Sequence, residues 1–308
     1  MKYHFLTIMA MTAIIWSAVS QKRIEPSDED ILLAESLKTT YEDDHVAITK
    51  SSDHITFDLD SRNGLVIVKH HASEDLINLD SRSDIQVYSF YNGESEIEEM
   101  NILYKNGKNA EFYFSDEAYT SEDLFHNDVR VKYAQVDFPL RGYRYTAAIE
   151  LKYKDIKYFT KVFFNDEYPI VEKEIIIEVP KWLEIEFKEM NFEDVNIEKS
   201  VKVSENGKYT IHTYRMRDIP AQFKEDNTPG PTYIYPHLLV LPKSFEKNGN
   251  TQNIFNSTDD LYSWYKSLTD QLTNDTNEIK SKVADLTSGP LTDNEKLKNI
   301  HYSLQDNI

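Results

Sequence analysis

The 308-residue chain carries 53 acidic and 34 basic residues, and this net charge of −19 argues against nucleic acid, whose phosphates bind Lys and Arg. Hydrophobic residues make up 40% and aromatic residues 12%, which excludes a disordered chain and favours β-strands. Cysteine is absent, which excludes disulfides, Cys-ligated zinc and a thiol nucleophile within this chain.

Residues 1–20 have the pattern of a secretory signal peptide. Lys2 lies in a short positive region, Phe5–Ala18 is apolar, and the small residues Ser17–Ser20 predict cleavage before Gln21. The apolar stretch is shorter than the ~20 residues of a membrane-spanning helix. We therefore expect a secreted or periplasmic protein with no stable membrane insertion after signal cleavage.

Residues 21–44 form a polar N-terminal segment. Ser27 and Asp30 have the spacing of a helix cap, which predicts a short helix over Glu29–Leu37. Ile31, Ala34 and Leu37 fall on one side of that helix.

Residues 45–255 have the pattern of an antiparallel β-rich domain. Apolar and polar residues alternate over Ile55–Asp60, Ile85–Phe90 and Val129–Tyr133. Many such strands separated by nearby turns predict a mainly β fold, either an antiparallel β-sandwich or a large twisted sheet.

Turn residues predict how these strands connect. Asn106-Gly107, before Phe112–Phe114, and Glu205-Asn-Gly207 each indicate a hairpin. Lys154-Asp155 is expected to join two long paired strands, 145–153 and 156–164.

Prolines mark further boundaries in the β-rich domain. Pro169 and Pro180 are expected to bound one strand, because proline cannot donate a hydrogen bond to a sheet. Residues 218–237 hold four prolines and predict an ordered crossing loop or a linker before a strand at 238–241.

Residues 256–308 change to a helical period. Thr258 is expected to cap a helix with Trp264 and Leu272 on its apolar face, and Thr276 to start another. Thr292 and Glu295 form a capping box for a last helix. Its apolar stripe runs to Ile308 without a covering neighbour, so we expect this chain to be the front part of a larger protein.

Two stretches, Tyr214–Leu238 and Trp264–Leu268 with Leu291–Ile308, carry a resemblance to a bacterial family of secreted proteins. Residues 126–192 are also similar in order and spacing, and the resemblance covers roughly 40–308. In that family a β-rich N-terminal domain of unknown function precedes a transglutaminase-like (papain-type) core. The resemblance implies that 256–308 is the truncated start of such a core, whose partner within the molecule is the domain at 45–255.

The resemblance also implies chemistry that this chain does not contain. An active core of the family uses a Cys-His-Asp triad in which a thiolate attacks an amide carbonyl. No residue of that triad can be assigned here, because the chain has no Cys. The full-length protein is then expected to cleave peptides or transfer acyl groups as a thiol protease or acyltransferase.

Other candidate sites have simpler explanations. His70 and His71 are neighbours on a predicted strand and point to opposite faces, so a surface pair is expected rather than a metal site. Asp58–Gly64 departs from the spacing of a calcium loop and is expected to be a polar turn. Ser115–Asp123 is an acidic loop for which solvation is expected over weak Ca²⁺ binding, and His126 with Asp128 makes no triad.

Six aromatic residues are candidates for a surface on which sugars stack, although we expect them to pack in the core or across strands. They are Trp182, Trp264, Tyr143, Tyr145, Tyr153 and Tyr158.

We assign no catalytic, cofactor-binding or metal-ligating residue from the sequence. The leading functional hypothesis is a non-catalytic, secreted accessory domain that positions a protein or polysaccharide substrate for a transglutaminase-like core. The alternative is a free-standing binding module for polysaccharide or a surface protein. An independent hydrolase is the least favoured, because no nucleophile and base can be named.

Overall fold

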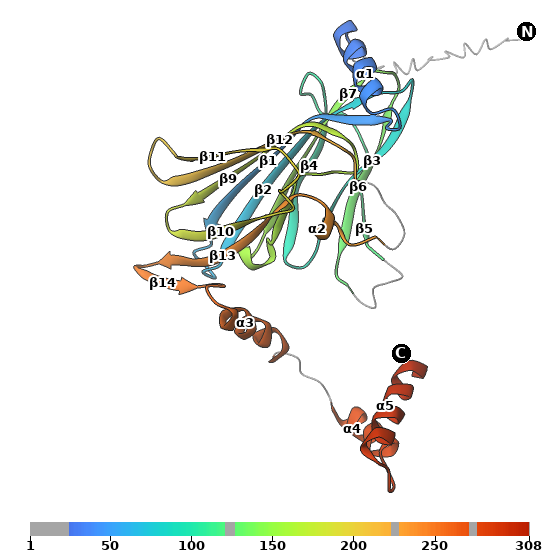
Figure 1. Cartoon of the computed structure of the whole chain (residues 1–308), viewed down its shortest axis with the longest axis vertical. Helices are drawn as coiled ribbons and strands as arrows, with labels where there is room; N and C mark the ends of the chain where they lie inside the picture. The colour runs from blue at the N-terminus through green and yellow to red at the C-terminus, as the bar shows by residue number, and fades with distance from the viewer. Residues whose placement is uncertain (1–24, 121–126, 223–227, 271–275, 308) are drawn as a thin grey trace, which may run out of the picture.

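The computed structural model describes residues 25–120, 127–222, 228–270 and 276–307. The predicted signal peptide and its cleavage site before Gln21 lie outside these residues. The architecture is mainly β, with one large sheet, two smaller sheets and helices near the C-terminus (Figure 1). The prediction of a mainly β fold followed by a helical segment is confirmed.

The large sheet has seven strands in the order β11, β12, β9, β1, β2, β7 and β4. Its strands are β1 (Val46–Leu59), β2 (Val66–Asn78), β4 (Ser95–Tyr104), β7 (Arg144–Tyr153), β9 (Ile170–Pro180), β11 (Ile197–Val203) and β12 (Tyr209–Ile219). All neighbours are antiparallel except β1 and β9, which run parallel. This pair departs from the expected antiparallel pattern, because the long segment between the two strands allows a crossover.

Two smaller sheets complete the β structure. In the second sheet, β13 (His237–Lys247) pairs with β8 (Lys161–Phe163), β10 (Leu183–Met190) and β14 (Asn250–Asn253). The third sheet has the order β3 (Ser83–Tyr91), β6 (Arg130–Phe138) and β5 (Ser115–Ala118). In Figure 1 these sheets lie toward the two sides of the view, with β1 and β2 between them.

Several turn predictions are confirmed. Gly207, with a φ of 67°, turns the chain between the paired strands β11 and β12. Gly107, with a φ of 77°, lies in the turn after β4. The chain returns there through a single bridge between Leu103 and Asn109, so the expected second strand at Phe112–Phe114 does not form.

The predicted pairing across Lys154-Asp155 is wrong. The Asp155 carboxylate accepts the Lys157 amide at 3.1 Å and caps a short 3-10 helix, η1 (Ile156–Tyr158). This turn redirects the chain, so that β8 pairs with β13 instead of β7. Two boundaries were predicted correctly, since β9 lies between Pro169 and Pro180.

The proline-rich stretch 218–237 is described only in part, since residues 223–227 lie outside the described ranges. It contains a short helix, α2 (Pro231–Ile234), and leads into β13, which contains the predicted strand at 238–241.

The N-terminal helix α1 (Asp28–Thr40) begins at the predicted cap. The Ser27 hydroxyl accepts the Asp30 amide at 3.3 Å, and the Asp30 carboxylate accepts the Ser27 amide at 3.1 Å. Ala34 of this helix is buried against a small apolar cluster of Ala47, Ile77 and Leu79. The helix therefore covers one end of the large sheet (Figure 1).

Three helices follow the β structure: α3 (Thr258–Asp270), α4 (Thr276–Leu286) and α5 (Asp293–Asn307). The cap of α3 is Ser257, one residue before the expected Thr258, because the Ser257 hydroxyl accepts the Asp260 amide at 3.2 Å. The capping box of Thr292 and Glu295 is confirmed.

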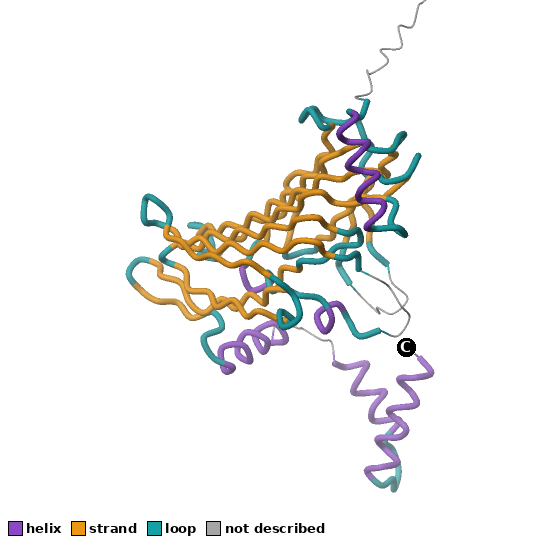
Figure 2. Tube along the Cα trace, turned by 45° about the horizontal axis from the view of Figure 1, so that its top comes forward, coloured by secondary structure: helices purple, strands orange, loops and turns teal. Residues whose placement is uncertain are grey.

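The C-terminal helices differ in their packing. Trp264 of α3 contacts Tyr158 and Phe255 edge to face, whereas α4 and α5 lie side by side (Figure 2). The side chains of Leu272 and Ile308, which were expected on apolar faces, lie outside the described residues. Within the described ranges, the helices are too short or too polar to cross a bilayer.

Candidate functional site

The residues considered in the sequence do not gather into one site. His70 Nε2 lies 2.6 Å from Asp53 Oδ1, whereas His71 Nδ1 lies 3.4 Å from Glu150 Oε1. The two rings thus point to opposite faces, as predicted. A surface pair is nevertheless wrong for His70, whose side chain is only 14% exposed because it faces the interior of the sheet.

The two acidic segments are explained by local bonds. Asp60 accepts the Arg62 amide at 2.9 Å, which confirms a polar turn at Asp58–Gly64. Asp116 of β5 pairs with Arg130 at 2.7 Å. Residues 121–126, including His126, lie outside the described ranges. In the described part of the chain, no group of three or more His, Asp or Glu side chains is arranged to hold a metal ion.

The aromatic residues considered as a sugar-stacking surface pack in core and cross-strand contacts, as expected. Tyr143 and Tyr145 are buried, and Trp182 packs against the core. Tyr153 contacts the Phe159 ring at 5.1 Å between centroids. Together with the Tyr158–Trp264 contact, this places the aromatics in pairs, so they do not form an exposed strip.

The site that the sequence reasoning missed is a charged centre on the inner face of the large sheet. Strand register places Lys173 of β9, Ser51 of β1 and Glu74 of β2 in one row across three neighbouring strands. Asp53 and His70 follow on the same faces of β1 and β2, since alternate residues of a strand share a face. The sequence contains a pattern that indicates this centre, because these polar residues occupy alternate positions that are otherwise held by core residues of the same strands.

An ion pair forms the deep part of this centre. Lys173 Nζ lies 2.9 Å from Asp53 Oδ2, and both residues are buried. Although burial opposes its ionisation, Lys173 and His70 hold the pKa of Asp53 well below its usual range. Burial also opposes the charge on Lys173, but Asp53 and Glu74 raise its pKa. Lys173 is therefore protonated and forms an ion pair with Asp53.

Two further carboxyl groups, those of Glu74 and Asp166, interact electrostatically with this pair. Burial raises the pKa of Glu74 to about 8, and Asp166 adds to this rise while Lys173 opposes it. The pKa of Asp166, in the loop after β8, is raised by burial as well. Asp166 accepts the Glu167 amide at 2.6 Å, whereas among the described residues the Glu74 carboxyl has neither a hydrogen bond nor an ion pair.

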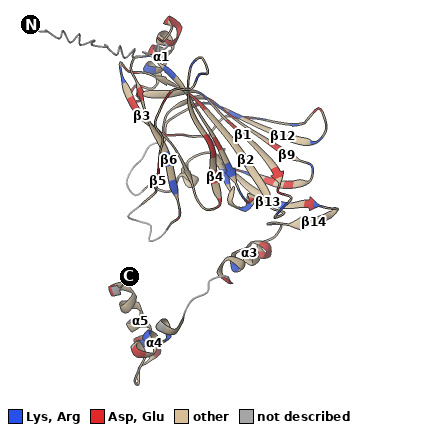
Figure 3. Ribbon diagram, turned by 180° about the vertical axis from the view of Figure 1, so that it is seen from behind, with Lys and Arg blue, Asp and Glu red and all other residues tan. Residues whose placement is uncertain are grey.

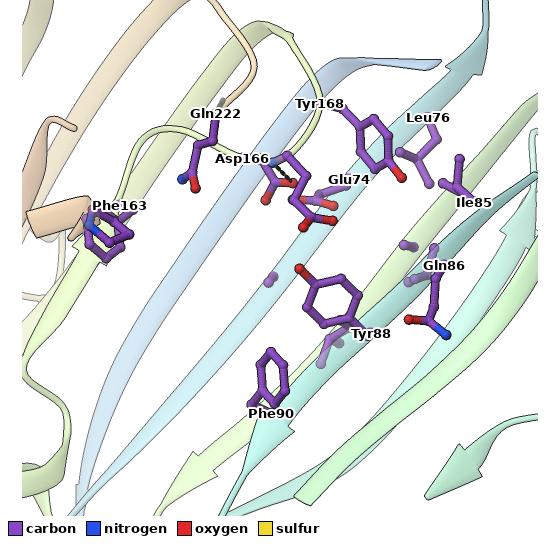
Figure 4. A pocket seen from close by; sticks show the side chains of 16 residues that line it. Glu74, Leu76, Ile85, Gln86, Tyr88, Phe90, Phe163, Asp166, Tyr168 and Gln222 are labelled. Atoms are coloured by element: carbon purple, nitrogen blue, oxygen red, sulfur yellow. Dashed lines mark hydrogen bonds between the residues drawn. The ribbon is translucent and has the colours of Figure 1, made fainter. Parts of the chain in front are cut away.

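These carboxyl groups line a cavity of about 560 Å³. Apolar residues of β2, β3 and β7 form much of its wall, and its polar groups come from Glu74, from Gln86 and Tyr88 of β3, from the Asp166–Tyr168 loop and from Gln222. Figure 4 shows Glu74 and Asp166 close together, with the Tyr88 hydroxyl directed toward this acidic group. We call this space the acidic cavity. Its volume is in the range of small-ligand sites.

The tyrosines of the acidic cavity stay protonated. Burial and the carboxylates of Glu167 and Asp166 raise the pKa of Tyr168 to about 12. Burial and a hydrogen bond with Glu167 raise the pKa of Tyr88 further. The cavity therefore offers carboxyl groups and phenol hydroxyls around one space, while nearby Lys173 is paired with Asp53. Such a site can bind a cation or exchange a proton.

Comparisons with known proteins agree with part of the sequence analysis. The family model of a "Domain of Unknown Function with solved-structure structure (DUF3857)" matches residues 63–223. A search of curated proteins gives no significant match. The matched range contains Glu74, Asp166 and Lys173 but leaves out Asp53.

Solved structures share the fold. A protein from Parabacteroides distasonis, described as a "putative protease", has a TM-score of 0.54 at 16% identity over 86% of this chain and 50% of its own. This chain thus spans about half the length of that protein, and the likeness shows the fold alone. A "putative nutrient binding protein" from Legionella pneumophila (TM-score 0.35, 9% identity, covering 85% of this chain and 94% of its own) carries no argument. The same holds for yeast LTA4 hydrolase with bestatin (TM-score 0.32, 12% identity, 67% and 30%).

Proposed function

The chain belongs to the DUF3857 family, and we propose that it is a non-catalytic, substrate-positioning region that binds a cationic group of its substrate in the acidic cavity. In this proposal it serves a transglutaminase-like, amide-bond-acting core outside these 308 residues. The observation that carries it is the pairing of Glu74 and Asp166 on a cavity wall without a cation of their own.

A cation is the ligand that this arrangement favours. Burial, and after it the neighbouring Asp166 carboxylate, oppose ionisation of Glu74 and raise its pKa to about 8. An ammonium or guanidinium group would allow both to ionise and would gain charge-assisted hydrogen bonds. The charge of Lys173, which lies 2.9 Å from Asp53, lowers the pKa of both carboxyl groups only in part, because both remain raised.

The same geometry argues against catalysis by the cavity itself. Ser51 lies in register between Lys173 and Glu74, which places a hydroxyl near a possible base. A lysine must lose its proton to activate a serine, and Asp53 keeps Lys173 protonated. The absence of Cys from the sequence likewise leaves no thiol for a Cys-His-Asp triad.

Two observations support the link to a separate core. The sequence resembles the first domain of transglutaminase-like proteins, and the solved structure with the same fold is about twice as long and is described as a "putative protease". The proposed order is a secreted chain in which the β domain presents the substrate and the downstream core acts on an amide bond. Sequencing the gene beyond the codon for Ile308 tests this part. An open frame that encodes Cys, His and Asp supports it, and a stop codon contradicts it.

Calorimetric titration tests the binding claim. The probe is Nα-acetyl-L-lysine methylamide, which carries one ammonium group and no free termini. We expect saturable binding that Glu74→Gln weakens at least about tenfold, since the variant loses a charge-assisted contact. Glu150→Gln is the matched control, because Glu150 lies on neighbouring β7 and points outward to His71. Equal binding by both variants would contradict a role for the acidic cavity.

The alternative, a free-standing module for polysaccharide or a surface protein, draws on exposed aromatic side chains at the border of the acidic cavity, which Phe90 also lines. Phe90 and Tyr119 are 45% and 40% exposed, and their ring centroids lie 5.1 Å apart on the side of the third sheet. Their edge-to-face arrangement differs from the flat platform that stacks on sugars. Titration with soluble oligosaccharides and a Tyr119→Ala variant separates the two functions, because Tyr119 is not one of the residues that line the acidic cavity.

A further inference from the structure

The acidic cavity is bordered by the backbone edge of β3. Ile85, Gln86, Val87 and Tyr88 all line it, although consecutive side chains of a strand point to opposite faces. Both faces of β3 border the same space only if the space lies beside the strand's edge. Figure 4 agrees, with β3 running along one side of the group that contains Glu74 and Asp166.

This edge of β3 is open. β3 pairs with β6 along its whole length from Ser83 to Tyr91, and in the described ranges no strand pairs with its other side. In an antiparallel pair, alternate residues direct their amide and carbonyl groups away from the partner strand. Those groups of β3 therefore face the cavity and can take an additional strand.

We propose that the substrate of the acidic cavity is an extended peptide segment that adds to β3 as a strand and places a Lys or Arg side chain between Glu74 and Asp166. This inference rests on the proposed function, and it names the class of substrate. Strand addition supplies affinity through main-chain hydrogen bonds, while a pocket for one side chain supplies specificity.

The lining of the cavity fits such an occupant. Alternate side chains of an added strand point in opposite directions, so one cation can enter the acidic group while its neighbours face away. Apolar groups at Leu76, Ala147 and Ile149 line the same cavity and suit the aliphatic stem of lysine or arginine. Charge complementarity selects a basic peptide over an acidic one, because the chain's own Lys173 stays with Asp53.

The test uses the full chain and three capped probes. The first is the peptide acetyl-Thr-Val-Lys-Val-Thr-amide, the second is the same peptide with the amides of both valines and of the lysine N-methylated, which removes donors from both edges of the strand, and the third is Nα-acetyl-L-lysine methylamide. N-methylation removes strand hydrogen bonds but keeps charge and side chains. We expect the first peptide to bind at least about tenfold more tightly than either other probe, and Glu74→Gln to weaken it.

The outcomes separate the two claims. Equal binding of the plain and N-methylated peptides, both weakened by Glu74→Gln, would overturn strand addition and leave the cation site standing. Binding of the plain peptide that N-methylation abolishes but Glu74→Gln does not change would overturn the cation's placement. Failure of all three probes to bind would overturn both the inference and the proposed function. A peptide with norleucine in place of lysine is expected to lose most of its affinity.

Discussion

Consecutive residues of β9 take part in two ion-pair networks that differ in their surroundings. Lys173 faces the interior and pairs with Asp53, and both are buried. Glu172 and Glu174 alternate with Lys173 and face the other way, where they pair with Arg215 and Arg217 of β12. Figure 3 marks the acidic and basic positions along the ribbon. Water can solvate the outer charges when an ion pair between them breaks, whereas the inner charges are shielded from water. Ion pairs therefore form a solvated surface on one face of β9 and a buried charged centre on the other.

The two faces also differ in whether their acidic side chains have a cationic partner. Each outer carboxylate of this network has an arginine partner, as for Arg217 Nη1 and Glu198 Oε1 at 2.6 Å. Among the described residues of the inner face, Asp53 has Lys173 in contact and Glu74 has no ion pair, and the pKa of Glu74 is raised to about 8. A protein that needs only stability gains nothing from such an unpaired, half-buried acid. That imbalance is the reason for treating the inner face as a ligand site.

The largest effect is expected from Lys173→Met. The substitution leaves the Asp53 carboxyl buried without its cation, and breaking one side of a buried pair costs about 3–5 kcal/mol. Urea unfolding followed by circular dichroism measures the loss of unfolding free energy. A loss below about 1 kcal/mol would place the inner pair in the same class as the outer one.

A pH-dependent effect is expected from Glu74→Gln. The carboxyl has an ordinary pKa of 4.5 and a folded pKa of about 8. Between these values the folded chain keeps a proton that the unfolded chain has lost, so the free energy of unfolding falls as pH rises, by at most about 1.4 kcal/mol per pH unit.

Glutamine resembles the protonated acid, so the variant should be more stable than the parent chain at pH 8 and similar to it at pH 4.5. Asp166 keeps part of the pH dependence, since its pKa is raised as well. Urea midpoints at several pH values measure this difference. A variant that is less stable at pH 8 would contradict the raised pKa.

The smallest effect is expected from Arg217→Met, which breaks the outer network. Arg217 and Glu198 are 47% and 53% exposed, and exposed ion pairs contribute about 0–1 kcal/mol. The same urea measurement should show a change within that range. A change as large as that of Lys173→Met would mean that burial does not distinguish the two faces.

Local patterns in the sequence predicted the elements well. Caps at Ser27 and Thr292 and the turn at Gly207 lie where they were expected, because each depends on a few adjacent residues. Neither the parallel pairing of β1 with β9 nor the antiparallel pairing of β8 with β13 could be predicted in this way. Both join segments that are distant along the chain, and alternation does not specify the partner of a strand.

The charged centre was partly visible in the sequence. Asp53 precedes Ile55 and Phe57 in one alternating series, and Lys173 precedes Ile175 and Ile177 in another. A charged residue in phase with core positions indicates a buried polar site, and this signal was overlooked. The approach of Asp166 was not predictable, because it depends on where the loop after β8 is held by β13.

The most direct test of the central claim is the titration of the Glu74 carboxyl by carbon-detected NMR, with Glu74→Gln to assign the signal. We predict a pKa of about 8 in the free chain and a lower value when Nα-acetyl-L-lysine methylamide is saturating, because a bound ammonium stabilises the carboxylate. An ordinary value near 4.5, or a raised value that the lysine derivative does not change, would contradict the assignment of the acidic cavity as a cation-binding site.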